Sequence, residues 1–144
     1  MSPQRPLELI LARNLLSSIS TPAFLVGEPG TLLYFNEAAE AMLGRRYEET
    51  GRLDAETWTR EFGPFGDDGT PIPYDEIPAT VAVRSQRPFH GRFRIHTSHG
   101  VGDVAASAIP IVGPGGSSGA IVFFWPVEDA REAVAGQQQH GGTT

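Results

Sequence analysis

Two residue types are missing from this sequence of 144 residues, which contains no cysteine and no lysine. Without cysteine, the chain has no disulfides, no thiolate nucleophile and no cysteine-ligated zinc site. Without lysine, it has no phosphate-loop lysine and no amine for Schiff-base catalysis. The formal net charge of −6 has the wrong sign for nucleic-acid binding, so we expect no nucleic-acid partner.

Long hydrophobic runs are also missing. The longest, such as Gly119–Val127, is too short to span a membrane, and Glu8, Arg13 and Asn14 interrupt the apolar residues near the N-terminus. We therefore expect no membrane span, no secretion signal and a cytoplasmic location. The length is that of one domain with its own core.

Apolar periodicity predicts a helix over residues 7–19. One face of this helix carries a stripe with three- and four-residue spacing, made of Leu7, Ile10, Leu11, Leu15 and Ile19. Leu9 and Leu16 widen the apolar surface beyond that stripe. An exposed stripe of this size is unusual on a monomer, so we expect it to be buried.

Five strands and three short helices are predicted in the rest of the chain. The strands are expected at residues 23–27, 31–35, 89–97, 101–112 and 120–127, and the helices near 36–43, 54–62 and 75–85. The last strand is apolar at almost every position, which is typical of a central strand covered on both faces. Glycine- and proline-rich residues predict loops at 63–73 and 113–119.

This order of elements predicts an α+β fold with one antiparallel sheet and helices grouped on one face. The expected organisation is an N-terminal amphipathic helix within residues 1–20, one domain over 21–129, and a tail over 130–144. The tail is rich in Gln and Gly, so we expect it to be disordered.

Three segments resemble a PAS domain. Residues 23–44 read AFLVGEPGTLLYFNEAAEAMLG, which is similar to the family's opening strand, turn, strand ending in Tyr-Phe-Asn and Ala-rich helix. Residues 66–73 read GDDGTPIP and precede Ile77-Pro78, like the connector of many bacterial sensor PAS domains. Residues 120–125 and the following Val-Glu-Asp resemble the last strand and exit. The resemblance covers residues 15–129 and implies a five-stranded PAS sheet in the order 2-1-5-4-3, with the N-terminal helix on the face opposite the short helices.

The resemblance also bears on cofactors, of which none is identified. LOV-type flavin photochemistry needs a cysteine, and this chain has none. Oxygen-sensing haem PAS domains commonly take an axial histidine from the helix before the third strand, and residues 75–85 contain no His. A covalent flavin adduct and this type of haem are therefore not expected, while flavin held without an adduct stays open.

A ligand pocket is expected between the sheet and the three short helices. Its candidate lining residues are Met42, Trp58, Phe62, Ile77, Val81, Phe93 and Ile95. This mostly apolar lining favours an apolar or aromatic ligand over a sugar phosphate. Plain core packing of the same side chains is the alternative. We expect no catalytic residues.

Several polar residues suggest chemistry but have simpler interpretations. Asn36 stands at a strand–helix junction, and we interpret it as a helix N-cap. Residues 115–119 read GGSSG and match the G-x-S-x-G hydrolase elbow, but a strand rather than a helix is predicted to follow, so we interpret them as a hairpin loop. Asp129 and His140 would follow in triad order, but His140 falls in the predicted tail.

Three histidines and an aspartate in the region of the third and fourth predicted strands have the residue types of metal ligands: His90, His96, His99 and Asp103. His90 and His96 are about 20 Å apart along an extended strand, too far for one metal ion. We interpret these residues as part of a solvated face and expect no metal site. With Arg92 and Arg94, this face is suited to docking a partner's carboxylates.

The sequence therefore favours a sensory or signal-relay module with PAS resemblance and no enzymatic activity. Because only a short segment follows the last predicted strand, we expect its output to act in trans on a partner protein. PAS domains with an N-terminal helix commonly pair through it, so we expect a homodimer whose interface includes the Leu7–Ile19 stripe. The alternatives are a small α+β hydrolase or isomerase with a cone-shaped fold, and a ligand-free dimerisation scaffold.

Overall fold

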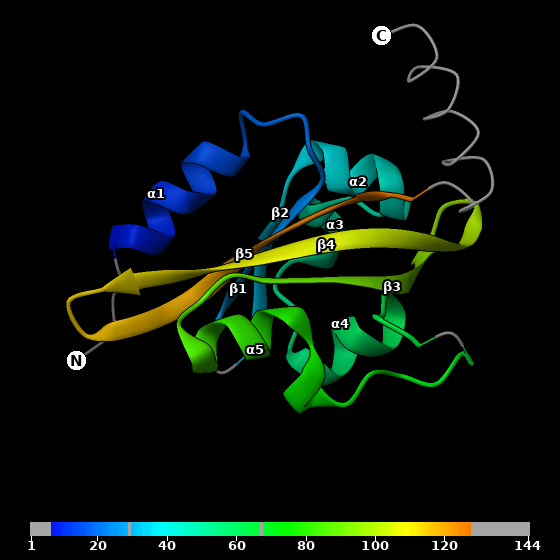
Figure 1. Cartoon of the computed structure of the whole chain (residues 1–144). Coiled ribbons are helices and arrows are strands. Elements are labelled where there is room, and N and C mark those ends of the chain that lie inside the picture. Colours follow the sequence, from blue (N-terminus) through cyan, green and yellow to red (C-terminus); the bar gives the residue numbers. More distant parts are fainter. Residues whose placement is uncertain (1–6, 29, 67, 128–144) are drawn as a thin grey trace, which may run out of the picture.

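A five-stranded antiparallel sheet forms the centre of the computed structural model, which describes residues 7–28, 30–66 and 68–127 (Figure 1). The strands lie in the order β2-β1-β5-β4-β3, so β5 is central between β1 and β4. The elements along the chain are α1 (Leu7–Leu16), β1 (Ala23–Gly27), β2 (Thr31–Phe35), α2 (Glu37–Leu43), α3 (Tyr47–Thr50), α4 (Ala55–Glu61), the 3-10 turn η1 (Tyr74–Glu76), α5 (Pro78–Ser85), β3 (Phe89–Thr97), β4 (Gly100–Gly113) and β5 (Gly116–Pro126). The expected α+β fold and strand order are confirmed. The expected tail lies outside the described residues.

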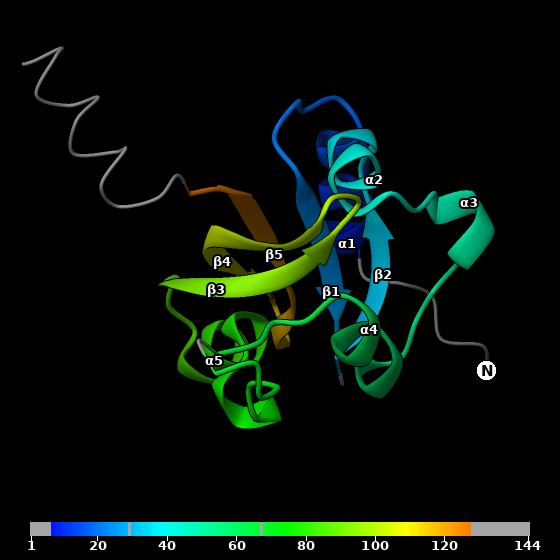
Figure 2. The same ribbon diagram turned by 90° about the vertical axis from the view of Figure 1, so that its right-hand side faces the viewer.

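The sheet separates two apolar clusters. On one face, buried residues of all five strands pack with α2, α4 and α5 in the main core. On the other face, Leu9, Ala12 and Leu16 of α1 pack on Ala23 and Leu25 of β1 in a smaller cluster. In Figures 1 and 2, α1 therefore lies on the opposite side of the sheet from α4 and α5. None of the described helices is long and apolar enough to cross a membrane.

Two predicted helices have different limits in the structure. The first helix ends at Leu16 instead of Ile19, because the hydroxyls of Ser17 and Ser18 donate back to carbonyl oxygens of the helix and compete with its continuation. The helix predicted over residues 75–85 is divided into η1 and α5. Ile77 has extended backbone there (φ −65°, ψ 136°), because a residue that precedes proline avoids the helical region.

One further prediction about local structure was wrong, and one short helix was not predicted. The loop predicted over residues 113–119 is a tight turn, because Gly113 pairs with Gly116 and β5 begins there. Gly116 has a φ of 103°, a backbone conformation that glycine adopts without strain. The four-residue helix α3 was not predicted, since it is too short to show apolar periodicity.

Candidate functional site

An apolar cavity of about 50 Å³ lies between the core face of the sheet and helices α4 and α5. It is lined by Phe24, Trp58, Phe62, Gly63, Pro64, Ile77, Pro78, Ala79, Phe93, Ile95, Val104, Ala106, Val122 and Phe124. None of these side chains is titratable, so the cavity can hold an apolar group but offers no acid–base pair. Its volume is several times below the 300–1,000 Å³ or so of a typical ligand pocket.

Most of the predicted pocket residues border this cavity. Trp58, Phe62, Ile77, Phe93 and Ile95 line it. Met42 packs partly buried against the same core but does not line the cavity. Val81 is half-buried and does not line it either, because α5 turns Ala79 and Ala82 toward the core.

The predicted set missed the residues that the sheet contributes from its central strands. Phe24 of β1 packs its ring against four others, with centroid distances of 4.8 Å to Phe124, 5.9 Å to Phe35, 6.0 Å to Trp58 and 6.1 Å to Phe62. Phe24, Val122 and Phe124 line the cavity. The sequence signal that could have found them is the apolar character of β1 and β5 at consecutive positions, which requires side chains on both faces of the sheet.

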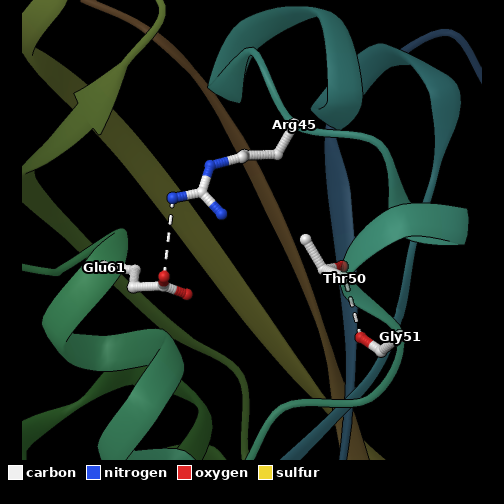
Figure 3. A network of polar contacts seen from close by, with 4 residues as sticks. All are labelled: Arg45, Thr50, Gly51 and Glu61. Carbon is white, nitrogen blue, oxygen red and sulfur yellow. Dashed lines mark hydrogen bonds and ion pairs between the residues drawn. The ribbon is translucent and has the colours of Figure 1, made fainter.

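Arg45 lies beside the aromatic wall of the cavity, in the connection between α2 and α3. Its guanidinium nitrogen is 3.4 Å from a carboxylate oxygen of Glu61 in α4 (Figure 3). Its guanidinium carbon is 6.0 Å from the ring centroid of Phe62. Nearby, the Thr50 hydroxyl donates to the Gly51 carbonyl at 3.3 Å. An exposed ion pair of this kind contributes little to stability, so it does not lock α4 in place.

On the opposite face of the sheet, α1 buries one side and exposes the other. The buried side consists of Leu9, Ala12 and Leu16. Four residues of the predicted stripe remain exposed: Leu7 at 65%, Ile10 at 45%, Leu11 at 57% and Leu15 at 56%. The fifth, Ile19, packs partly buried against the small cluster. The side that α1 turns to its own sheet is thus not the predicted stripe but the side marked by Leu9 and Leu16, which also follows helical spacing.

Polar contacts fix α1 along its length. Near its start, the Ser118 hydroxyl donates to Glu8 Oε1 at 3.1 Å. Near its end, the Arg13 guanidinium lies 4.8 Å from the ring centroid of Tyr34 and 5.6 Å from that of Tyr47. Burial raises the pKa of Tyr34 above its usual value, although the positive charge of Arg13 acts against this shift. The outward side of α1 is therefore held in a defined orientation.

Asn36 connects the end of α1 to the main core and is fully buried. Its Oδ1 accepts hydrogen bonds of 3.0 Å from the N–H groups of Ala23 and Ala39, so the predicted N-cap role is confirmed. Its Nδ2 also donates to three carbonyl oxygens at the end of α1 and in the connection to β1, those of Leu16 at 3.1 Å, Ile19 at 3.3 Å and Thr21 at 2.8 Å. These three contacts could not be predicted from the sequence, because they join residues 15 to 20 positions apart.

On the polar face, His90, His96 and Asp103 have different contacts. His90 Nδ1 is 2.7 Å from the Ser107 hydroxyl, and Arg94 donates to Asp103 at 3.1 Å. The ring of His96 lies 4.7 Å from that of Phe65. Among the described residues, no three His, Asp or Glu side chains come close enough together to hold a metal ion.

The GGSSG segment belongs to the β4–β5 hairpin and is followed by strand, as predicted, although its residues 116–119 already form the start of β5 rather than a loop. Gly119 pairs with Gly27, and a Cβ at Gly119 would collide with the carbonyl oxygen of Val26. This glycine thus serves the close approach of β1 and β5 and not a hydrolase elbow. Asp129 and His140 lie outside the described residues.

No family model and no curated protein matches the sequence. Among solved structures, the PAS domain of BvgS from Bordetella pertussis is 15% identical, with 94% of this chain and 98% of that chain covered and a TM-score of 0.59. The PAS domain of nitrogen regulation protein NR(II) from Vibrio parahaemolyticus is 11% identical, with 81% and 98% covered and a TM-score of 0.57. The phage VqmA–DPO complex is 10% identical, with 95% and 59% covered and a TM-score of 0.63.

These likenesses and the 2-1-5-4-3 sheet define the class of the structure, which is a PAS fold. The resemblance noted in the sequence is thereby confirmed at the level of the fold. At 10–15% identity, the likeness assigns no ligand, partner or activity to this chain.

Proposed function

We propose that this chain is a non-enzymatic sensory and signal-relay module, in which an apolar or aromatic ligand in the core cavity acts through the sheet on α1. The observation that carries the proposal is the alternation of side chains along β5. Val122 and Phe124 line the cavity, whereas Ile121 and Phe123 pack in the cluster under α1. Displacing this one strand would therefore disturb both faces at once.

The small volume of the cavity supports a change on binding. At about 50 Å³ it has no room for a whole ligand of ordinary size, so a ligand must push apart the walls that it meets. Close-packed interiors respond to such a displacement by shifting whole elements, because they have few voids to absorb it. A solved neighbour, VqmA, is complexed with DPO, which gives a precedent for a ligand complex among chains similar to this one.

We propose that the outward side of α1 responds to ligand binding and that it contacts a second copy of the chain. Its exposed leucines and isoleucine are an apolar surface of the kind that marks an interface. Ile109 and Trp125 add exposed apolar area on the same face of the sheet, at 40% and 43% exposure. A symmetric pair would place the same patch of both subunits in contact, and the relay would reach a partner protein in trans through this dimer.

Sedimentation analysis of the double variant Leu11→Glu/Leu15→Glu tests the dimer. We expect the wild type to be a dimer and the variant a folded monomer, because each buried leucine contributes about 1.5–3 kcal/mol. Ser85→Glu is the control for an added carboxylate, since Ser85 is exposed at the end of α5, on the opposite face of the sheet, and should leave the dimer intact. A wild type that stays monomeric at high micromolar concentration would overturn the dimer proposal.

Ligand titration followed by the same sedimentation measurement tests the relay. A ligand that enters the cavity should shift the monomer–dimer equilibrium, and dimerisation should change its affinity by the same factor. A dimer that no ligand perturbs would instead indicate a dimerisation scaffold.

A further inference from the structure

A second hollow of about 220 Å³ adjoins the wall of the core cavity on the side of η1 and α5. It lies between the β1–β2 turn and these two elements, and its lining includes Glu28, Gly30, Tyr74 and Arg84. We refer to it as the outer cleft. Unlike the core cavity, it has polar and charged groups in its lining.

Trp58 and Ala79 line both the core cavity and the outer cleft. The indole N–H of Trp58 donates to the Gly30 carbonyl at 2.8 Å, which ties this side chain to the β1–β2 turn. Ala79 offers only a methyl group, so the partition between the two spaces is thin. Together, the two volumes approach the lower end of the range of small-molecule sites.

The charges around the outer cleft favour a cation. Arg84 is already paired, since its guanidinium nitrogen lies 2.7 Å from a carboxylate oxygen of Asp75. The exposed carboxylate of Glu28 has no hydrogen bond or ion pair within the described part of the chain. Trp58 adds the aromatic ring that binds organic cations best. A ligand carboxylate would be repelled by the carboxylate of Glu28, and it could bind Arg84 only by displacing Asp75.

We propose that the core cavity and the outer cleft form one ligand site divided by Trp58, and that the site takes a small organic amine. The aromatic or aliphatic end of the amine enters the core cavity and displaces the Trp58 side chain. The ammonium group stays in the outer cleft beside Glu28 and the indole ring. This inference rests on the proposed sensory function and deepens it by naming the ligand class.

Three probes of similar shape test the inference: 2-phenylethylamine, 2-phenylethanol and phenylacetate. Binding is followed by fluorescence in a Trp125→Phe background, which leaves Trp58 as the reporting tryptophan. We expect the amine to bind about tenfold more tightly than the alcohol, and phenylacetate to bind most weakly. The variant Glu28→Gln should lower affinity for the amine to that for the alcohol and leave the alcohol unchanged.

Two results would overturn the inference while leaving a cavity sensor intact. One is binding of phenylacetate as tight as that of the amine, and the other is no effect of Glu28→Gln, which lies on an exposed turn and does not threaten folding. Ala79→Leu, which fills the partition, should weaken all three probes. If no probe binds at concentrations up to roughly 10 mM, the inference fails together with the ligand-sensing part of the proposed function.

Discussion

The two faces of the sheet are covered to different degrees. On the main-core face, α2, α4 and α5 cover an apolar core that contains a small, partly open apolar cavity. On the α1 face, one helix covers β1 and the adjoining parts of β4 and β5, and its own outward leucines stay in solvent. Apolar surface without a packing partner thus lines a cavity on one face and is exposed on the outside of α1 on the other. An internal space suits a small molecule, whereas an external surface suits a macromolecule.

Two of the strands connect these faces. Phe24 and its neighbours Ala23 and Leu25 in β1 repeat the alternation of β5, with Phe24 at the cavity and the other two under α1. Because β1 is buried on both sides and β5 packs alternate residues against both clusters, we expect a rearrangement of one cluster to affect the other. The comparison between the faces can be tested by changing one face at a time.

The largest expected effect comes from Asn36, which joins the two faces. Asn36→Ala removes five hydrogen bonds, three of which are buried. Unpaired buried partners cost about 1–3 kcal/mol each, so the three buried bonds alone predict a loss of about 4 kcal/mol or more in unfolding free energy. Urea unfolding measures it.

Asn36→Asp separates the two roles of this residue. Aspartate is as good an N-cap as asparagine, so a purely capping role would make this variant nearly neutral. The structure instead places Nδ2 against three carbonyl oxygens, where a carboxylate oxygen would be repelled. We therefore expect Asn36→Asp to be strongly destabilised, and a wild-type stability would contradict the role of Asn36 in holding α1.

The next effect distinguishes the two sides of α1. Leu16→Ala truncates a fully buried leucine and should lower the unfolding free energy by about 3 kcal/mol. Leu11→Ala changes a side chain that is 57% exposed and should change the stability of the monomer by no more than about 0.5 kcal/mol. The same Leu11→Ala change should weaken the proposed dimer, which sedimentation would reveal. Equal losses of monomer stability in the two variants would contradict the orientation of α1.

A smaller effect tests the cavity on the main-core face. Ala106 lines the cavity, whereas Ala108, two positions along β4 on the same face, is fully buried and does not. Ala106→Val adds two carbons to empty apolar space and should raise the unfolding free energy by about 1 kcal/mol. Ala108→Val should lower it by about 1–3 kcal/mol through overpacking. Changes of the same sign in thermal or urea unfolding would show that the cavity is not real free space.

The positions of the strands could be predicted from the sequence, but the exact limits of the helices could not. Strand alternation and turn residues gave the strand positions, and the apolar run of residues 120–127 correctly indicated a central strand. Local interactions that compete with helix formation were harder to predict. Two serines end α1 early, and the residue before Pro78 interrupts the predicted helix over 75–85. These outcomes depend on individual hydrogen bonds and backbone angles that periodicity does not register.

The candidate site was predicted only in part for a related reason. Aromatic residues on the helices, such as Trp58 and Phe62, were found because few positions on short helices can face a core. Phe24 and Phe124 were missed because a strand with apolar residues at consecutive positions gives no sign of which residue faces which layer. The buried side of α1 was ambiguous in the same way, since leucines occupy two of its faces.

The smallest expected effect is the response of α4 to acid, which concerns only the main-core face. Hydrogen bonds from the side chain and the backbone N–H of Thr57 lower the pKa of the Asp54 carboxyl below its usual value. A group whose pKa is lower in the folded state stabilises folding above its unfolded pKa, and that stabilisation is lost as the pH falls through the folded pKa. Below about pH 4, the cap of α4 should therefore weaken.

Amide hydrogen exchange can detect this weakening at the start of α4. Protection of the Thr57 and Trp58 amides should fall in the wild type as the pH drops, after correction for the intrinsic exchange rate. In Asp54→Asn the cap does not titrate, so this acid-dependent loss should disappear while the helix remains capped. Asp68→Asn is the matched control: hydrogen bonds from Thr70 lower the pKa of Asp68 in the same way, but in a loop that does not cap α4. If Asp68→Asn removed the effect and Asp54→Asn did not, the acid response of α4 would arise outside its cap.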